Sequence, residues 1–286
     1  MKQIKIFIEL TRLDKPIGFM LLFWPCAWSL TLAYYYNQES TLYIKHLILF
    51  FLGSVLMRSA GCIFNDIIDR NLDQKVARTR ERPIASGKIS VLNSLVYVTI
   101  LCLLALLILL QFNKLTIILG MGSMILAFSY PFMKRITYWP QLFLGLTFNW
   151  GIIMGWSSLI NNISIEPFML YISAIFWTLG YDTIYGLQDI DDDEIIGVKS
   201  TSIKFKNNVK IFVTTCYSLC VLLILILALM IKIDKSLLLL SVFFILSLLY
   251  QIKNFKINNP KSCLLSFRIN NLTGSFIFLF ILSFNY

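Results

Sequence analysis

Two short stretches of this chain concentrate side chains that can bind a metal ion. Ten of its fifteen acidic residues lie within residues 66–81 and 182–194. Each stretch leaves an apolar segment directly, and ionisable side chains at such positions are costly in a membrane and mark functional sites by default. The acidic residues are therefore the first candidates for chemistry.

The first stretch, residues 65–73, reads Asn-Asp-Ile-Ile-Asp-Arg-Asn-Leu-Asp. If it continues the preceding apolar segment as a helix, Asn65, Asp69 and Asp73 fall at i, i+4 and i+8 on one face, and Asp66 borders that face. Like charges at this spacing repel one another. A cation must offset them, and a divalent ion does so better than a single basic side chain.

The second stretch reads Asp-Ile-Asp-Asp-Asp and places Asp189 and Asp193 at i, i+4. Carboxylates without histidine or cysteine partners suit Mg²⁺ or Mn²⁺ rather than zinc, and the chain has a single histidine, His46. Mg²⁺ takes one or two carboxylates and fills its remaining positions with water and substrate phosphates. Two acidic patches at one membrane face therefore predict a pair of ions that clamp a diphosphate.

Basic residues follow both acidic stretches and can hold the remaining diphosphate oxygens. The alternative is that they anchor the chain at the membrane surface, an interpretation we favour for Lys204, Lys206 and Lys210. The predicted diphosphate-binding residues are Arg70, Lys75, Arg78, Arg82, Lys134 and Lys199.

The elements that position these residues are apolar segments. Hydrophobic residues make up 58% of the 286 residues and charged residues 14%, whereas soluble domains carry about 25% charge. A membrane span needs about 20 apolar residues. We therefore predict an all-α, polytopic membrane protein that forms one domain over residues 1–286, with motif loops at about 65–88 and 188–208. The nine predicted spans are 17–36, 45–64, 89–112, 115–133, 139–160, 165–187, 209–231, 236–252 and 263–285.

The basic residues also predict an orientation in the membrane. With a cytoplasmic N-terminus and nine spans, nineteen lysines and arginines fall on the cytoplasmic side and four on the other. This positive-inside bias accounts for most of the net charge of +10, so no nucleic-acid partner is expected. The N-terminal residues resemble neither a signal peptide nor a transit peptide, which favours a bacterial cell inner membrane.

The acidic motifs resemble those of the intramembrane aromatic prenyltransferases, and the match is closest to the 4-hydroxybenzoate branch of ubiquinone biosynthesis. The resemblance extends from residue 12 to about 205. Its motifs are residues 12–18 (Arg-Leu-Asp-Lys-Pro-Ile-Gly), 65–73, 78–83 (Arg-Thr-Arg-Glu-Arg-Pro), 128–135 (Phe-Ser-Tyr-Pro-Phe-Met-Lys-Arg), 189–193 and 196–201 (Ile-Gly-Val-Lys-Ser-Thr).

This resemblance implies nine transmembrane helices around a central cavity, with both motifs at its cytoplasmic mouth. It implies Mg²⁺ as cofactor, and polyprenyl diphosphate and 4-hydroxybenzoate as substrates. Asp69, Asp73, Asp189 and Asp193 are then the catalytic aspartates. The expected metal ligands are these four residues together with Asn65 and Asp66.

Two further residues are candidates for binding the acceptor. Arg58 lies seven residues before Asn65 on the same helical face, where it can hold a benzoate carboxylate or form a structural ion pair. Asp182 can assist removal of the ring proton or cap a helix near Gly180. The same chemistry on a naphthoate, homogentisate or haem-type acceptor is an alternative. A transporter is another alternative, and it predicts inverted repeats and broken helices.

Overall fold

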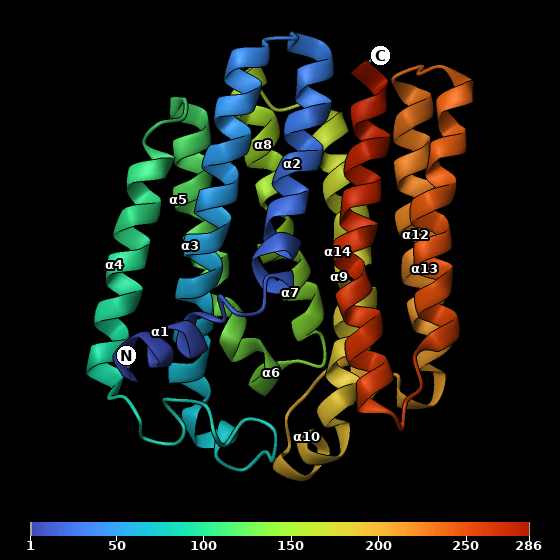
Figure 1. Ribbon diagram of the computed structural model, residues 1–286. Coiled ribbons are helices and arrows are strands. Elements are labelled where there is room, and N and C mark those ends of the chain that lie inside the picture. Colours follow the sequence, from blue (N-terminus) through green and yellow to red (C-terminus); the bar gives the residue numbers. More distant parts are fainter. Residues whose placement is uncertain (1, 286) are drawn as a thin grey trace.

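The computed structural model describes residues 2–285, and this part of the chain is helical without β-strands. The long helices run side by side along one axis (Figure 1). They are α2 (Ile17–Asn37), α3 (Ser40–Asp73), α4 (Val91–Leu109), α5 (Lys114–Ser129), α7 (Pro140–Asn149), α8 (Gly151–Ile160), α9 (Ile165–Gly186), α12 (Val209–Met230), α13 (Ser241–Asn254) and α14 (Pro260–Leu282).

Shorter elements join the long helices, mainly at the end of the bundle that carries both acidic motifs, which we call the motif end. The other α-helices are α1 (Lys2–Thr11), α6 (Met133–Ile136), α10 (Ile190–Ile196) and α11 (Thr201–Lys204). The 3₁₀ turns are η1 (Tyr130–Phe132), η2 (Leu187–Asp189), η3 (Lys206–Asn208), η4 (Lys235–Leu240) and η5 (Ser283–Asn285).

Within residues 2–285, eight helical segments are long and apolar enough to cross a membrane. The all-α membrane fold is thus confirmed, but the count of nine spans is not. The predicted span 165–187 corresponds to α9, which lies in the bundle beside α7, α12 and α14 but is not among the eight. The reason is its polar content, which includes Glu166 and Asp182.

Helix α3 positions the first acidic motif. It has 34 residues, which at 1.5 Å per residue gives about 51 Å, whereas the hydrocarbon core of a bilayer is about 30 Å thick. Residues 65–73 are its last turns, so the helix predicted for this stretch is confirmed. A single helix therefore spans the membrane and extends beyond it to carry the motif.

Close contacts at small residues hold the helices together, as expected in a membrane where the hydrophobic effect does not drive helix association. A side chain at Gly155 of α8 would place its Cβ 2.6 Å from the Cys26 carbonyl oxygen and 3.1 Å from the Leu30 amide nitrogen of α2. Helix α2 also packs against α14, where the Trp28 indole donates to the Gly274 carbonyl at 2.8 Å.

Buried hydrogen bonds join α9, α12, α13 and α14. The Trp177 indole donates to Asn270 Oδ1 (2.8 Å), and the Asn270 amide donates to Gln251 Oε1 (2.9 Å). Tyr217 donates to the same Gln251 oxygen at 2.7 Å. These bonds satisfy polar groups that would be costly to leave unpaired in lipid.

Replacing Gly155 with alanine should lower the thermal unfolding midpoint in detergent, because the new Cβ would overlap backbone atoms of α2. Gly122→Ala in α5 is the matched control, since a Cβ there meets nothing within 4 Å. Alanine favours a helix over glycine by about 1 kcal/mol, so the control should leave the midpoint unchanged or raise it. Equal midpoints for the two variants would contradict close packing of α2 on α8.

Candidate active site

The three carboxylates of the first motif are buried on one side of α3. Asp66 and Asp69 are each 1% exposed and Asp73 is 6% exposed. Asn65 donates its amide to Asp69 Oδ2 at 3.0 Å, which confirms that these two residues share a helical face. Buried like charges require partners, and every partner that the structure describes for them is basic or an amide.

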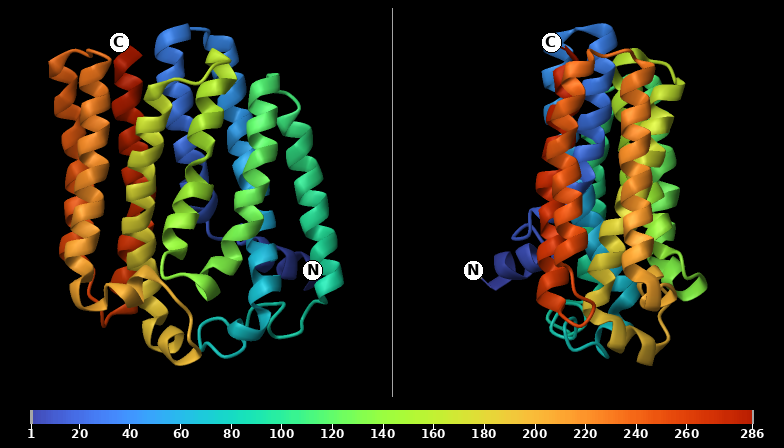
Figure 2. Two further views of the ribbon diagram at one scale, coloured as in Figure 1. Left: turned by 180° about the vertical axis from the view of Figure 1, so that it is seen from behind. Right: turned by 90° about the vertical axis from the view of Figure 1, so that its right-hand side faces the viewer.

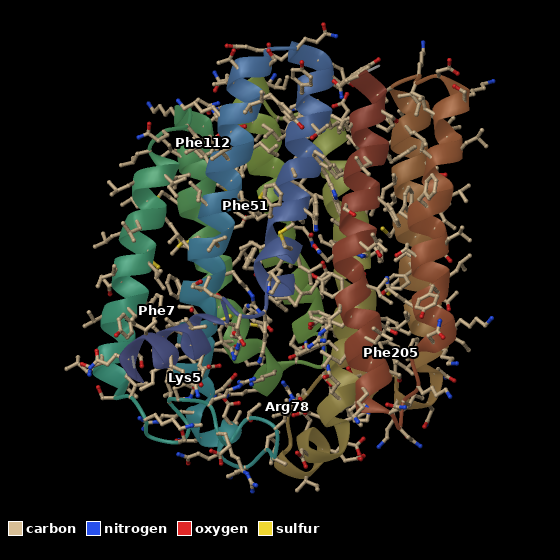
Figure 3. The ribbon with its side chains drawn as sticks, viewed as in Figure 1. Lys5, Phe7, Phe51, Arg78, Phe112 and Phe205 are labelled. Atoms are coloured by element: carbon tan, nitrogen blue, oxygen red, sulfur yellow. The ribbon has the colours of Figure 1, made fainter. Side chains whose placement is uncertain are left out.

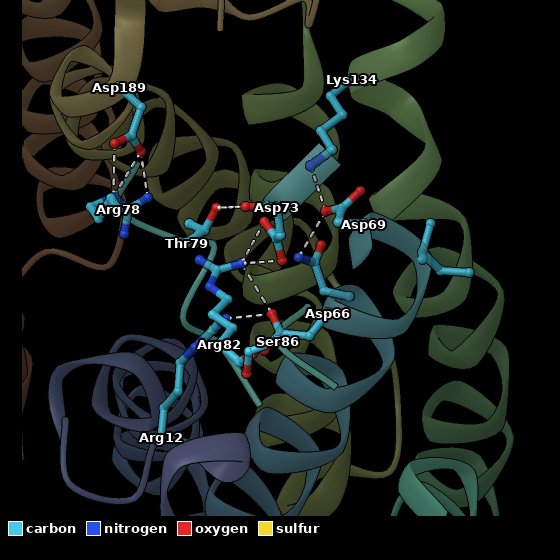
Figure 4. Close-up of polar contacts among 12 residues, drawn as sticks. Arg12, Asp66, Asp69, Asp73, Arg78, Thr79, Arg82, Ser86, Lys134 and Asp189 are labelled. Carbon is cyan, nitrogen blue, oxygen red and sulfur yellow. Dashed lines mark hydrogen bonds and ion pairs between the residues drawn. The ribbon is translucent and has the colours of Figure 1, made fainter. Parts of the chain in front are cut away.

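Arg82 lies between two of these carboxylates. Its Nη1 contacts Asp66 Oδ1 at 3.1 Å and both carboxylate oxygens of Asp73 at 3.0 and 2.9 Å. Asp66 is also paired with Arg12, which follows α1, with Nη2 to Oδ1 at 2.5 Å. Figure 4 shows the two arginines meeting at Asp66.

The third carboxylate, Asp69, is paired with two residues of α6. Lys134 Nζ forms an ion pair with Asp69 Oδ2, and Arg135 Nη2 lies 3.3 Å from Asp69 Oδ1. Helix α6 follows η1, whose Pro131 cannot continue the hydrogen bonding of α5. The turn at the end of α5 thus brings two cations to the first motif.

The second motif is held by the loop that follows the first. Arg78 Nε contacts the two carboxylate oxygens of Asp189 at 2.8 and 2.9 Å, and Arg78 Nη1 donates to the Tyr185 hydroxyl at 3.2 Å. The Ala77 amide donates to Asp192 Oδ2 at 3.3 Å. Loop 74–90 therefore links both motifs, which lie at the same end of the bundle (Figures 1 and 4).

Asp193 lies within electrostatic reach of Asp189, Lys134 and Arg78. Burial, followed by the repulsion from Asp189, raises the pKa of Asp193 to about 6. Lys134, which is paired with Asp69, partly offsets this shift. Lys134 thus interacts with both motifs, and Asp193 loses its proton more readily when a further cation is nearby.

The donor set fits a hard cation, because both motifs offer only carboxylate and amide oxygens. Among residues 2–285, however, no three Asp, Glu, His or Cys side chains are close enough to hold one ion. Basic side chains separate the carboxylates instead. Most of the carboxylate oxygens that could bind a divalent cation therefore already have arginine or lysine partners in this structure.

The other predicted diphosphate-binding residues lie apart from the carboxylates. Arg70 and Lys75 are exposed, and the described part of the chain gives their side chains no ion pair. Lys199 Nζ donates to the Ile136 carbonyl at 3.1 Å and lies over the Tyr138 ring. The backbone amide of Lys199 donates to the Lys134 carbonyl at 2.9 Å, so Lys199 is adjacent to the site.

Comparison with known proteins identifies the family of this chain. Residues 22–279 match the UbiA prenyltransferase family. This chain belongs to that family. A mitochondrial 4-hydroxybenzoate polyprenyltransferase of Arabidopsis thaliana is 46% identical over 214 residues, 74% of this chain and 52% of the relative. The chain thus spans about half the length of such relatives.

Solved structures support the UbiA fold. A UbiA homolog from Aeropyrum pernix K1 superposes with a TM-score of 0.78 at 21% identity, covering 92% of this chain and 97% of the homolog. A homolog from Archaeoglobus fulgidus, solved with GPP and Mg²⁺, gives 0.73 at 17% identity, with coverages of 98% and 99%. At these identities the likeness concerns the fold alone.

In this UbiA family member, the two predicted acceptor residues lie in the interior near the motifs. Arg58 of α3 lies over the Phe148 ring, 5.2 Å from its centroid, and its buried Nε has no hydrogen-bond partner. Asp182 and Tyr130 are half-buried and lie within electrostatic reach of Arg58. Arg58 and Asp182 form no ion pair that the structure describes, so the guanidinium keeps free donors.

Sequence reasoning assigned no role to Arg12 or Arg135, although both lie in motifs that carried the family resemblance. Arg12 pairs with Asp66, and Arg135 with Asp69. Tyr185 is a further residue of the site without a predicted role, and its hydroxyl accepts a hydrogen bond from Arg78. Charge balance is the feature of the sequence that indicates further partners. Three buried carboxylates require more cations than the arginines nearest to them in sequence provide.

Replacing Arg78 with methionine should free loop 74–90 from the second motif. Amide hydrogen exchange across residues 74–90 should become faster, because the contacts of Arg78 with Asp189 and Tyr185 are lost. The global unfolding midpoint should change little, since Arg78 is 41% exposed and such pairs contribute about 0–1 kcal/mol. Arg80→Met, at an exposed neighbour, is the control. Exchange that is equal in both variants would contradict the proposed link.

Proposed function

We propose that this chain transfers a polyprenyl group from polyprenyl diphosphate to the ring of 4-hydroxybenzoate. The products are 3-polyprenyl-4-hydroxybenzoate and diphosphate, and the pathway is ubiquinone biosynthesis. The meeting of both aspartate motifs and their basic partners at one end of an apolar bundle carries the proposal. The similar mitochondrial relatives are named as 4-hydroxybenzoate polyprenyltransferases, which supports the choice of acceptor.

The metal in this proposal is Mg²⁺, held by Asp69, Asp73, Asp189 and Asp193, with Asn65 and Asp66 as further oxygen donors. When bound, it neutralises the negative charge that develops on the leaving diphosphate. Asp66 is the least available of these residues for binding the metal ion, because two arginines already contact its Oδ1. Its role in the proposal includes orienting Arg12 and Arg82.

The basic side chains exchange carboxylate partners for diphosphate oxygens. Arg78 and Arg82 present planar guanidinium groups that match phosphate geometry, and Lys134 supplies a compact charge. Their pairing with aspartates keeps these cations beside the motifs before the substrate arrives. Arg70, Lys75 and Lys199 contribute charge near the site without touching the carboxylates.

The reaction breaks the bond between the allylic carbon and the diphosphate oxygen and forms a bond to the ring carbon beside the hydroxyl group. The helix bundle excludes water from the allylic cation, and aromatic faces stabilise positive charge. The ring then loses a proton. Asp182 is the candidate to accept it, since this carboxylate lies in the interior near Arg58 and Tyr130.

The acceptor carboxylate is assigned to Arg58. A buried guanidinium nitrogen without a hydrogen-bond partner is costly unless a ligand supplies the acceptor. A carboxylate forms two parallel bonds with arginine, which would orient the benzoate ring.

The proposal places the chain in an inner membrane with its N-terminus and both motifs on the cytoplasmic side, and treats residues 1–286 as one domain. The bacterial membrane expected from the sequence stays a prediction, and the relative named above is mitochondrial.

Prenyl transfer is tested by incubating membranes that contain the chain with labelled 4-hydroxybenzoate, a polyprenyl diphosphate and Mg²⁺. Label should enter the lipid extract. It should be lost with EDTA and restored by added Mg²⁺. Asp69→Asn and Asp189→Asn should each reduce the rate at least about 100-fold, the scale of losing transition-state charge stabilisation.

Asp234→Asn, at a loop far from the motifs in sequence, is the control and should retain full activity. Unlabelled naphthoate and homogentisate, added as competitors, separate the alternative acceptors. A prenylated product that forms unchanged in EDTA would overturn the metal assignment. Proton-driven uptake without any prenylated product would favour a transporter.

Replacing Arg58 with leucine should raise the apparent KM for 4-hydroxybenzoate by about tenfold or more, because a charge-assisted bond to the carboxylate is worth roughly 1.5–3 kcal/mol. The KM for polyprenyl diphosphate should stay nearly constant. Steady-state kinetics with each substrate varied in turn measures both values. Equal increases for the two substrates would assign Arg58 a structural role instead.

A further inference from the structure

The first helix, α1, has a wider apolar surface than its packing against the bundle covers. Leu10 is fully buried against α3 and α4, and the Phe7 ring packs edge-on against Tyr97 of α4, with centroids 5.3 Å apart. Ile4 and Ile8, which share one side of the helix at i, i+4, remain 65% and 37% exposed. Two large apolar side chains therefore keep part of their surface outside the contacts made by the described residues.

The depth of α1 along the bundle indicates what covers these side chains. Tyr97 lies six residues after the start of α4 at Val91, about 9 Å into a helix that spans the membrane. Leu95 and Val96 of α4 are also exposed near this level. The contact between Phe7 and Tyr97 thus places α1 beside a lipid-facing surface, and Ile4 and Ile8 extend that surface.

The orientation of α1 fits the boundary between headgroups and acyl chains. The helix runs across the bundle axis and projects outward at the motif end (Figure 2). Lys5 and Glu9 are exposed, and Figure 3 shows Lys5 and Phe7 on opposite sides of α1. A helix with one apolar side and one charged side is suited to the membrane interface.

A tight connection joins α1 to the first acidic motif. Helix α1 ends at Thr11, and the next residue, Arg12, has a left-handed backbone with φ of 54°. This conformation is unfavourable for a residue with a side chain, so its surroundings must hold it. The Lys15 amide donates to the Arg12 carbonyl at 2.9 Å, and the Arg12 side chain pairs with buried Asp66 at 2.5 Å.

We propose that α1 is an interfacial helix that inserts Ile4 and Ile8 among phospholipids at the boundary between headgroups and acyl chains, and that Arg12 couples this insertion to the first acidic motif through Asp66. The bilayer then helps to hold the last turns of α3. This inference concerns lipid contact and the structural order of the first acidic motif, so its tests do not depend on prenyl transfer.

Lipid contact is tested with nitroxide labels on the full chain in phospholipid nanodiscs. Ile4→Cys and Ile8→Cys are labelled separately, Glu9→Cys is the matched control on the charged side, and the chain without these substitutions measures labelling of its six native cysteines. Labels at positions 4 and 8 should collide more often with oxygen, which partitions into acyl chains, than with a water-soluble nickel chelate. Nickel accessibility equal to that of the Glu9→Cys label would overturn the proposal.

The coupling is tested by hydrogen exchange of residues 65–73 in four proteins. These are the unmodified chain, the Ile4→Asn/Ile8→Asn variant, the Arg12→Gln variant and the combination of all three substitutions. Loss of the isoleucines should speed exchange in this segment by about fivefold. The isoleucine substitutions should add little to the exchange rate of residues 65–73 once Arg12 is already replaced.

Lys5→Gln is the control for α1 and should leave the exchange of residues 65–73 unchanged. Full additivity of the isoleucine and Arg12 effects would overturn the coupling. Exchange in residues 65–73 that does not respond to the isoleucine substitutions would overturn it as well.

Discussion

The balance between buried carboxylates and basic side chains at the motif end governs the rest of this structure. Asp66, Asp69 and Asp73 lie together on one helix with almost no exposed surface, which is unfavourable without counter-charges. Arg12, Arg82, Lys134 and Arg135 supply them from three separate segments. The α1–α2 connection, loop 74–90 and α6 are therefore held at the motif end by ion pairs as well as by apolar packing.

This balance also explains how the site can be charged and ordered at once. In the proposed function, the basic side chains pair first with the aspartates and then with the diphosphate. Substrate binding therefore exchanges the partners of these side chains and does not create unpaired charge. The pKa of Asp193 is raised to about 6 by burial and by the repulsion from Asp189, so a cation placed beside Asp193 favours its charged form. In the proposed function, this geometry supplies both the carboxylates for a metal ion and the cations for the diphosphate.

Much of this arrangement follows from the sequence. The apolar segments predict the helices, and the i, i+4 spacing of Asn65, Asp69 and Asp73 predicts a shared face, which the bond from Asn65 to Asp69 confirms. The partners of the carboxylates were less predictable. Arg12 reaches Asp66 across 54 positions, and α6 reaches Asp69 only because the chain turns at η1. Such long-range pairing depends on tertiary packing, which local periodicity does not encode. The span count differed for another reason, because the polar residues of α9, Glu166 and Asp182 among them, lower its mean hydropathy.

The adjacency of α2 and α14 has a consequence for biogenesis. The second helix of the chain and the last one touch through Trp28 and Gly274 and through Trp24 and Asn271, and Asn270 of α14 also joins the polar bonds of α9 and α13. During translation α2 must enter the bilayer long before α14 leaves the ribosome. Until then the indole N–H groups of Trp24 and Trp28 lack the acceptors that α14 supplies, so the pairing of α2 with α14 follows the insertion of both helices.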